Sequence, residues 1–112
     1  MVEISGTTIT MVRGDTAKIS ISIKDAEGNA YTPAEGDSIR FAAKHKYTDS
    51  TPVILKQIDT GTMVLTIDPE DTESLGMGSA QGRYVYDIEI TQADGTVDTF
   101  IRGQLTLLEE VD

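Results

Sequence analysis

Residues 84–91 read Tyr-Val-Tyr-Asp-Ile-Glu-Ile-Thr, so that large apolar side chains occupy every second position at Tyr84, Tyr86, Ile88 and Ile90. Successive side chains of a strand face opposite sides of a sheet, and this period of two therefore predicts a half-buried β-strand. The same parity predicts that both tyrosine rings belong to the core.

Two other segments repeat the alternation. They are residues 16–24, with Ala17, Ile19, Ile21 and Ile23 on one face, and residues 39–44, with Ile39, Phe41 and Ala43 on one face. Weaker alternation predicts strands at 7–12, 53–58, 62–67, 97–102 and 104–109. Gly103 predicts a bulge within one long final strand, because Ile101, Leu105 and Leu107 share parity across it. Asp94-Gly95 is the clearest hairpin turn.

One segment departs from this pattern. Asp68-Pro69-Glu70-Asp71 has the residues of an N-cap, a proline at the first helical position and an acid at the third. Leu75 would then face inward and Gly76 would end the turn. The segment predicts one short helical turn between two strands.

The whole chain, residues 1–112, has the length of a single domain. Seven or eight short strands, separated by turns and joined once through a helical turn, favour an all-β fold. We expect an immunoglobulin-like antiparallel β-sandwich of two facing sheets.

Composition narrows the classes of partner. The chain has 9 basic and 19 acidic residues and a formal net charge of −10. Binding to a phosphate backbone or to an anionic membrane requires clustered Lys and Arg, so nucleic acid and membrane partners are disfavoured. There is no Cys, and therefore neither a disulfide nor a thiolate site is expected. The N-terminal residues lack the basic and apolar regions of a signal peptide, so we expect the chain to stay in the cytosol unless it leaves within an assembly or was cut from a longer protein.

His45 is the only histidine and the one candidate for acid–base catalysis. It continues the parity of Phe41 and Ala43 at a strand end, between Lys44 and Lys46, with no carboxylate nearby in sequence to orient it. A Ser-His-Asp triad needs three convergent groups, and no Gly-x-Ser-x-Gly motif is present. We expect a half-exposed structural histidine, no catalytic residue and no cofactor.

Asp68, Glu70, Asp71 and Glu73 form an acidic cluster. Its spacing does not match the EF-hand loop, and acids in the first turn of a helix are stabilised by the backbone dipole without a metal. Helix capping is the interpretation we favour, and calcium binding within residues 68–73 is the alternative. Arg13-Gly14-Asp15 has the tripeptide of adhesion ligands, yet Gly-Asp is also an ordinary turn between strands, which we favour.

Three residues are candidates for an interface: Val85, Phe100 and Tyr47. Val85 and Phe100 fall on the face opposite the predicted core, where an antiparallel sheet usually carries polar residues. Tyr47 lies near Lys44, Lys46 and Lys56 in a segment that could form a basic-aromatic patch for an acidic partner or a sugar. The competing interpretation of these lysines is a solvated face or a guarded edge strand.

The first part of the chain resembles the opening of small tail and baseplate domains of bacteriophages and prophages. The residues that carry this resemblance are Arg13-Gly14-Asp15-Thr16, the strand after it, Lys24-Asp25-Ala26-Glu27-Gly28-Asn29 and Ile39-Arg40-Phe41. In particular, they resemble the N-terminal immunoglobulin-like domain of phage baseplate upper proteins. Residues 82–88, Asp94-Gly95 and 103–105 are similar to the end of the same domains, whereas glycine-rich residues 76–82 do not align.

The resemblance implies a structural role in a phage tail or baseplate, through contacts with other phage structural proteins and with further copies of the chain. It implies no catalytic residues, and it places the protein in the bacterial cytoplasm and then in the virion. The alternative is a module that binds carbohydrate or a cell-surface ligand through loops at one end, with Tyr31 and Tyr47 as the aromatic residues outside the predicted core. An enzyme is the third hypothesis and rests only on a carboxylate pair such as Asp68 and Asp71.

Overall fold

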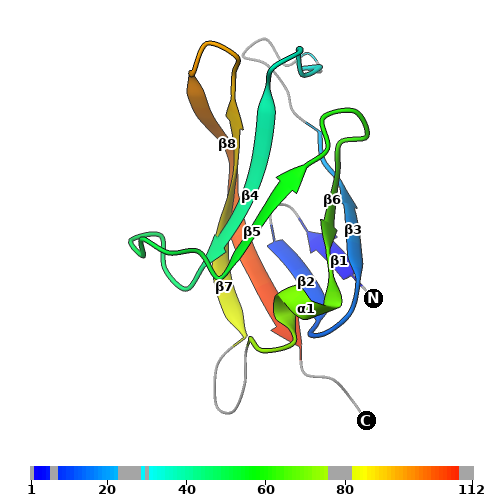
Figure 1. Cartoon of the computed structure of the whole chain (residues 1–112). Helices are drawn as coiled ribbons and strands as arrows, with labels where there is room; N and C mark the ends of the chain where they lie inside the picture. The colour runs from blue at the N-terminus through cyan, green and yellow to red at the C-terminus, as the bar shows by residue number, and fades with distance from the viewer. Residues whose placement is uncertain (1, 6–7, 23–28, 30, 76–81, 109–112) are drawn as a thin grey trace.

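The computed structural model of the chain describes residues 2–5, 8–22, 29, 31–75 and 82–108, which form eight strands and one helical turn (Figure 1). In chain order these elements are β1 (Val2–Ser5), β2 (Thr8–Val12), β3 (Ala17–Ser20), β4 (Ser38–Lys44), β5 (Ile54–Ile58), β6 (Val64–Ile67), α1 (Pro69–Thr72), β7 (Arg83–Thr91) and β8 (Val97–Leu108). The predicted strand count and the single helical turn are confirmed within this part of the chain.

The strands form two sheets of unequal size. Six strands form a mixed, curled half-barrel sheet in the order β1-β2-β8-β7-β4-β5, and β3 pairs with β6 in a second sheet. One continuous core joins the two sheets, because Ile19 of β3 and Leu65 of β6 belong to the same buried cluster as Phe41, Tyr86 and Leu105 of the large sheet. The small sheet therefore covers the concave side of the large one.

The core confirms the parity predicted for the strongest strands. Along β7 the tyrosines and isoleucines are buried, and along β4 Ile39, Phe41 and Ala43 are buried. Tyr84 and Tyr86 are each only 4% exposed. The Tyr86 ring packs against Phe41 with ring centroids 5.2 Å apart, and burial raises the pKa of Tyr86 above its ordinary value. Both tyrosines thus contribute to the core, as predicted.

The helical turn begins where the sequence predicted. Asp68 is the N-cap, Pro69 is the first helical residue, and the Asp71 carboxylate accepts a hydrogen bond of 2.7 Å from the Asp68 backbone N–H. This is the reciprocal arrangement of a capping box. Leu75 packs against the core as expected, and Gly76 lies outside the described residues.

The prediction of purely antiparallel sheets is wrong. β2 runs parallel to β8, from the pair Thr8–Gln104 to the pair Val12–Leu108, whereas the other pairs of strands are antiparallel. A parallel partner produces the same alternation of side chains as an antiparallel one. The sequence pattern therefore could not specify the direction of β2.

Several strand bounds also differ from the prediction. β1 was not predicted, and β8 is one strand whose irregularity lies at residue 100 rather than at Gly103: Ile88 pairs with Ile101, and Glu89 pairs with Thr99. β3 ends at Ser20 because its partner β6 begins only at Val64. Residues 23 and 24 of the predicted strand lie outside the described part of the chain.

Candidate functional site

The outward face of the large sheet brings together the residues that the sequence marked as an interface. Register places Lys44, Val85 and Gln104 side by side across β4, β7 and β8, and the next row contains Ala42, Asp87 and Arg102. All six positions lie on the face opposite Phe41, Tyr86 and Leu105 of the core, although Ala42 is itself buried. The face is therefore a continuous surface over three paired strands.

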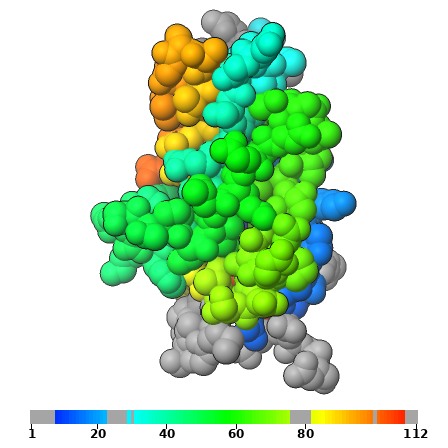
Figure 2. Space-filling model, in the orientation of Figure 1, coloured from blue at the N-terminus to red at the C-terminus, as the bar shows by residue number. Residues whose placement is uncertain are grey.

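Tyr47 lies on this face although it comes from the segment between β4 and β5. This segment, residues 45–53, projects from one side of the molecule (Figures 1 and 2). The Tyr47 hydroxyl lies 3.1 Å from the Gly103 carbonyl oxygen and 3.4 Å from that of Tyr86. A phenol has a single proton to donate, so Gly103 is the principal acceptor and Tyr86 the weaker one. The ring is held on the sheet while 40% of the residue remains exposed.

Arg102 completes this arrangement. Its guanidinium carbon lies 4.1 Å from the centroid of the Tyr47 ring, a cation–π contact of the kind that contributes about 0.5–1 kcal/mol at exposed sites. Each of the two side chains limits the rotamers of the other. The exposed atoms of Tyr47 and Arg102 are therefore held in a fixed arrangement on the surface of the sheet.

Asp87 lies beside Arg102 on the same row. Its Oδ1 is buried and has no hydrogen-bond partner among the described residues. One row further along the sheet, Arg40 is hydrogen-bonded to Glu89. The Glu89 carboxylate therefore has its hydrogen-bond donor within the chain. A buried acceptor such as Asp87 Oδ1 is ordinarily satisfied by a protein donor or by an ordered water.

We call the surface made by Lys44, Lys46, Tyr47, Arg83, Val85 and Arg102 the basic patch. Lys46, Arg83 and Arg102 are exposed, and Lys44 and Val85 are half-buried. Val85 and Tyr47 were predicted here, and the structure places both on the outward face. The side chain of Phe100 lies outside the described part of the chain. Arg102 and Asp87 were missed, because nothing in their local sequence indicates that a distant loop folds onto them.

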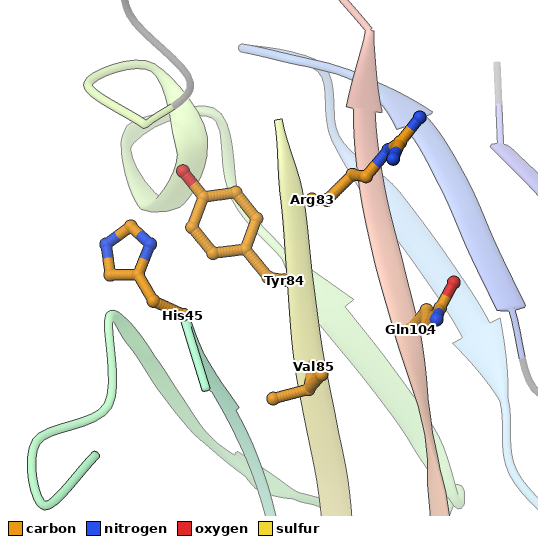
Figure 3. Close-up of a pocket in the computed structure, with 5 residues that line it drawn as sticks. All are labelled: His45, Arg83, Tyr84, Val85 and Gln104. Atoms are coloured by element: carbon orange, nitrogen blue, oxygen red, sulfur yellow. The ribbon is translucent and has the colours of Figure 1, made fainter. Parts of the chain in front are cut away.

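His45 lies at the edge of the basic patch, in an open depression of about 210 Å³ lined also by Arg83, Tyr84, Val85 and Gln104 (Figure 3). The imidazole packs against the Tyr84 ring, with centroids 5.0 Å apart and planes tilted by 42°. In Figure 3, Arg83 and Gln104 point away from this pair of rings. The depression is smaller than the roughly 300–1,000 Å³ typical of small-molecule sites, and His45 is exposed at the end of β4.

The acidic segment 68–73 is engaged within the fold. Lys56 of β5 lies 2.9 Å from Asp68 Oδ2 and 2.8 Å from Asp71 Oδ2. The hydrogen bonds to Asp71 and then to Asp68 raise the pKa of Lys56 above its ordinary value. Lys56 does lie on an edge strand, since β5 is the last strand of the large sheet, and its ammonium pairs with α1 rather than facing solvent alone. The capping interpretation is confirmed, and no group of three or more metal-ligating side chains occurs among the described residues.

Arg13-Gly14-Asp15 forms a turn between β2 and β3, as predicted. Gly14 has a positive φ of 86°, a conformation that glycine adopts without steric cost. The Arg13 guanidinium donates a 2.6 Å hydrogen bond to the Glu73 carbonyl oxygen. The tripeptide thus anchors α1 to the turn, which is a structural role.

Tyr31, the other aromatic candidate, is also engaged. Its hydroxyl donates a 2.6 Å hydrogen bond to Asp37 Oδ2, which also accepts one from the Ala34 N–H. The bond from Tyr31, followed by that from Ala34, lowers the pKa of Asp37, and the bond to Asp37 raises the pKa of Tyr31. This pair stabilises the loop before β4.

Comparison with known proteins gives no family for the chain: no protein-family model matches it, and no curated protein matches its sequence. Among the described residues, no helix is long and apolar enough to cross a membrane.

Proposed function

We propose that this protein is a structural module of a phage or prophage tail or baseplate, and that it acts through protein–protein contacts rather than through catalysis. The observation that carries the proposal is the basic patch, where Tyr47 is fixed by the Gly103 carbonyl and covered by Arg102. Tyr and Arg are enriched among the residues that dominate the energetics of protein interfaces. Side chains ordered before binding lose less entropy on association.

Apolar side chains at the basic patch support the same proposal. Val85 lies within the patch, one row away from the row of Ala42, Asp87 and Arg102. Leu55, which is 55% exposed, extends the row on the far side of Ala42 and adds apolar area.

The order of the strands supports the finer assignment of an immunoglobulin-like fold. Variable-type immunoglobulin domains have strands G, F, C and C′ adjacent in one sheet and strands B and E adjacent in the other. Here β8, β7, β4 and β5 are adjacent in one sheet, and β3 and β6 pair in the other. Chain order then assigns β3 to B, β4 to C, β5 to C′, β6 to E, β7 to F and β8 to G. The assignment agrees with the sequence resemblance to phage baseplate domains.

Carbohydrate binding has weaker support. Stacking on a sugar needs an accessible ring face, but Arg102 covers one face of Tyr47. Tyr31 is half-buried, packs against the core and uses its hydroxyl on Asp37. Tyr31 is therefore not an open stacking platform, and the contact with Arg102 leaves at most one face of the Tyr47 ring for a sugar.

The proposal is tested in the phage or lysogen that carries the gene. Deletion should give particles without a complete tail or baseplate, and an epitope-tagged copy should appear at a fixed position in purified particles under immunogold electron microscopy. Val85→Glu should exclude the protein from particles, because it buries a charge in the docking face. Ser20→Glu introduces the same residue at an exposed position of β3 and should be incorporated normally. Complete, infectious particles that lack the chain would disprove the proposal.

A further inference from the structure

The two ends of the large sheet carry opposite charge. At one end lies the basic patch: Lys44 and Arg83 lie at the ends of β4 and β7, Lys46 follows β4 in the next turn, and Arg102 lies further along the sheet, opposite Asp87. At the other end, at the top of Figure 1, the loop before β4 and the β7–β8 hairpin lie together. A Cβ on Gly36 would be 2.8 Å from the Cβ of Ala93, which shows how closely these two turns pack.

We call the second surface the acidic tip and define it by Glu35, Asp37, Asp94 and Asp98. Glu35, Asp94 and Asp98 are exposed. Hydrogen bonds from the Thr96 backbone and then from its side chain lower the pKa of Asp94, and those from Tyr31 and Ala34 lower the pKa of Asp37. The lowered pKa keeps Asp94 and Asp37 charged at neutral pH. Val97, which is 54% exposed, adds an apolar side chain beside Asp98.

The tip and the patch of one molecule cannot meet. They lie at opposite ends of the same strands: β7 begins at Arg83 and ends at Thr91, which pairs with both Ser38 and Val97. At about 3.3 Å per residue, Arg83 at the start of β7 lies roughly 25 Å from Thr91 at its end. Arg102, opposite Asp87 in the middle of β7, is the patch residue nearest the tip, and the docking contacts proposed below use Lys46 and Arg83 at the far end. A paired sheet does not fold back over that distance, so the complementary surfaces can only be joined between molecules.

We propose that copies of this chain associate head to tail, with the acidic tip of one copy docked on the basic patch of the next. In this contact Glu35 and Asp98 face Lys46 and Arg83, and Val97 packs on the apolar atoms of Val85 and Tyr47. Such an interface is heterologous, and repeated contacts of this type close into a ring or extend as a filament. This inference rests on the proposed function and specifies the partner as a second copy.

The net charge of −10 does not oppose the association at moderate salt. The Debye length is about 10 Å at 0.1 M ionic strength, so repulsion between whole molecules is screened while contacts at about 4 Å are not. At about 1 M salt the Debye length falls to about 3 Å, and the docking contacts weaken too. Association through apolar surface alone would not weaken in this way.

Sedimentation velocity on the purified chain tests the inference through a charge swap. Lys46→Glu/Arg83→Glu makes the patch acidic, and Glu35→Lys/Asp98→Lys makes the tip basic. Within the described part of the chain, these four exposed side chains form no hydrogen bond or ion pair, and circular dichroism should confirm that each variant keeps its β structure. Because each variant juxtaposes like charges, we expect self-association to weaken by about tenfold or more.

An equimolar mixture of the two variants should associate, since each tip then meets a patch of opposite sign. The variants carry net charges of −14 and −6, both still negative given the −10 of the natural chain, so overall attraction does not explain the recovery. As a matched control for Lys46→Glu, Lys18→Glu reverses one exposed charge on β3 and should associate like the natural chain.

A natural chain that stays monomeric at all concentrations in about 0.1 M NaCl would overturn the head-to-tail inference. The inference would also be overturned if both charge-swap variants associated as strongly as the natural chain, or if a mixture of the two variants stayed monomeric. None of these results bears on whether the chain is found in phage particles. The test of the proposed function therefore remains separate, and assembly with a different phage protein would survive a monomeric result.

Discussion

The backbone N–H of Gly14 donates a 2.9 Å hydrogen bond to the Oγ1 of Thr72. These residues are 58 positions apart, and the bond attaches helical turn α1 to the turn between β2 and β3. Thr72 is completely buried and is the one polar residue so placed in the described part of the chain. The same turn is attached a second time through Arg13 and the Glu73 carbonyl.

Thr72→Val should therefore destabilise the fold although it keeps the shape of the side chain. It leaves the Gly14 N–H without its acceptor, which costs about 1–3 kcal/mol. Thr72→Ser retains the hydroxyl and loses only a methyl group, so it should cost less. Urea denaturation followed by circular dichroism measures the difference. Equal free energies of unfolding for the two variants would contradict the role of the hydroxyl.

Lys56 should stabilise the protein in a manner that depends on pH. Its pKa is raised above the ordinary 10.5 by hydrogen bonds to Asp71 and Asp68, so its contribution is complete below about pH 10 and is lost as pH rises through the folded-state pKa. Lys56→Met should reduce the free energy of unfolding by about 1 kcal/mol at neutral pH. The difference from the natural chain should disappear at strongly alkaline pH.

Lys18→Met is the control for this experiment, because Lys18 is an exposed lysine on β3. Its effect on the unfolding free energy should be small and should not change with pH in the same interval. A Lys56→Met penalty that persists unchanged through strongly alkaline pH would show that its origin is packing rather than charge.

Asp37 should titrate below its ordinary pKa of 3.8, mainly because it accepts the Tyr31 hydroxyl and then because it accepts the Ala34 N–H. A lowered pKa in the folded state stabilises the fold above the unfolded-state pKa, and this stabilisation is lost as pH falls through the folded-state value. Tyr31→Phe removes the larger cause, so the Asp37 midpoint should rise toward 3.8. The carboxyl carbon chemical shift of Asp37, followed by NMR against pH, gives the titration midpoint in the natural chain and in Tyr31→Phe. Identical midpoints in the two proteins would show that the Tyr31 hydroxyl does not lower the pKa of Asp37.

Gly82→Ala should be strongly destabilising. A Cβ at this position would lie 2.4 Å from the Leu107 carbonyl oxygen, and the Gly82 carbonyl oxygen accepts a 2.6 Å hydrogen bond from the Leu107 N–H. Relief of such a clash requires β7 and β8 to separate, at about 1–3 kcal/mol or more. Gly61→Ala is the control, because its nearest obstacle is the flexible Asp59 side chain at 3.3 Å. Thermal denaturation should give a melting temperature for Gly82→Ala well below that for Gly61→Ala.

Tyr47→Phe should loosen residues 45–53 without unfolding the domain. It removes the hydrogen bond to Gly103 but keeps the ring beside Arg102, so the stability loss should stay near 1 kcal/mol. Tyr47→Ala removes both contacts and should loosen the segment more. Hydrogen–deuterium exchange at residues 46–53 measures this order. The same exchange rate in all three proteins would show that Tyr47 does not hold the segment on the sheet.

Much of the fold was predictable from short-range pattern. The inward faces of β4 and β7 followed from alternation alone, because successive strand side chains must point to opposite sides. The cap at Asp68 and the turn at Gly14 followed from local backbone chemistry, which depends only on adjacent residues. Val85 was placed on the outward face by the same parity.

The candidate site was only partly predictable. Tyr47 was recognised as an aromatic residue outside the core, but its contacts with Gly103 and Arg102 join positions more than 50 residues apart. The partner of Thr72, which is 58 positions away, was hidden for the same reason. The partners of Lys56 are nearer in sequence, at Asp68 and Asp71, but they lie across a turn and a further strand. No local signal specifies a contact of this range, because it depends on how far each sheet curls and on which strands become neighbours.

By itself, the sequence determined which side chains enter the core, where the chain turns and where one helical turn begins, since each depends on residues within a few positions of one another. Only the tertiary structure decided that β2 lies parallel to β8, that six strands form one sheet and two the other, and that the charged ends of the large sheet are kept apart. The physical reason is that strand pairing is a choice among distant partners, settled by which arrangement buries the apolar faces together and satisfies the backbone hydrogen bonds.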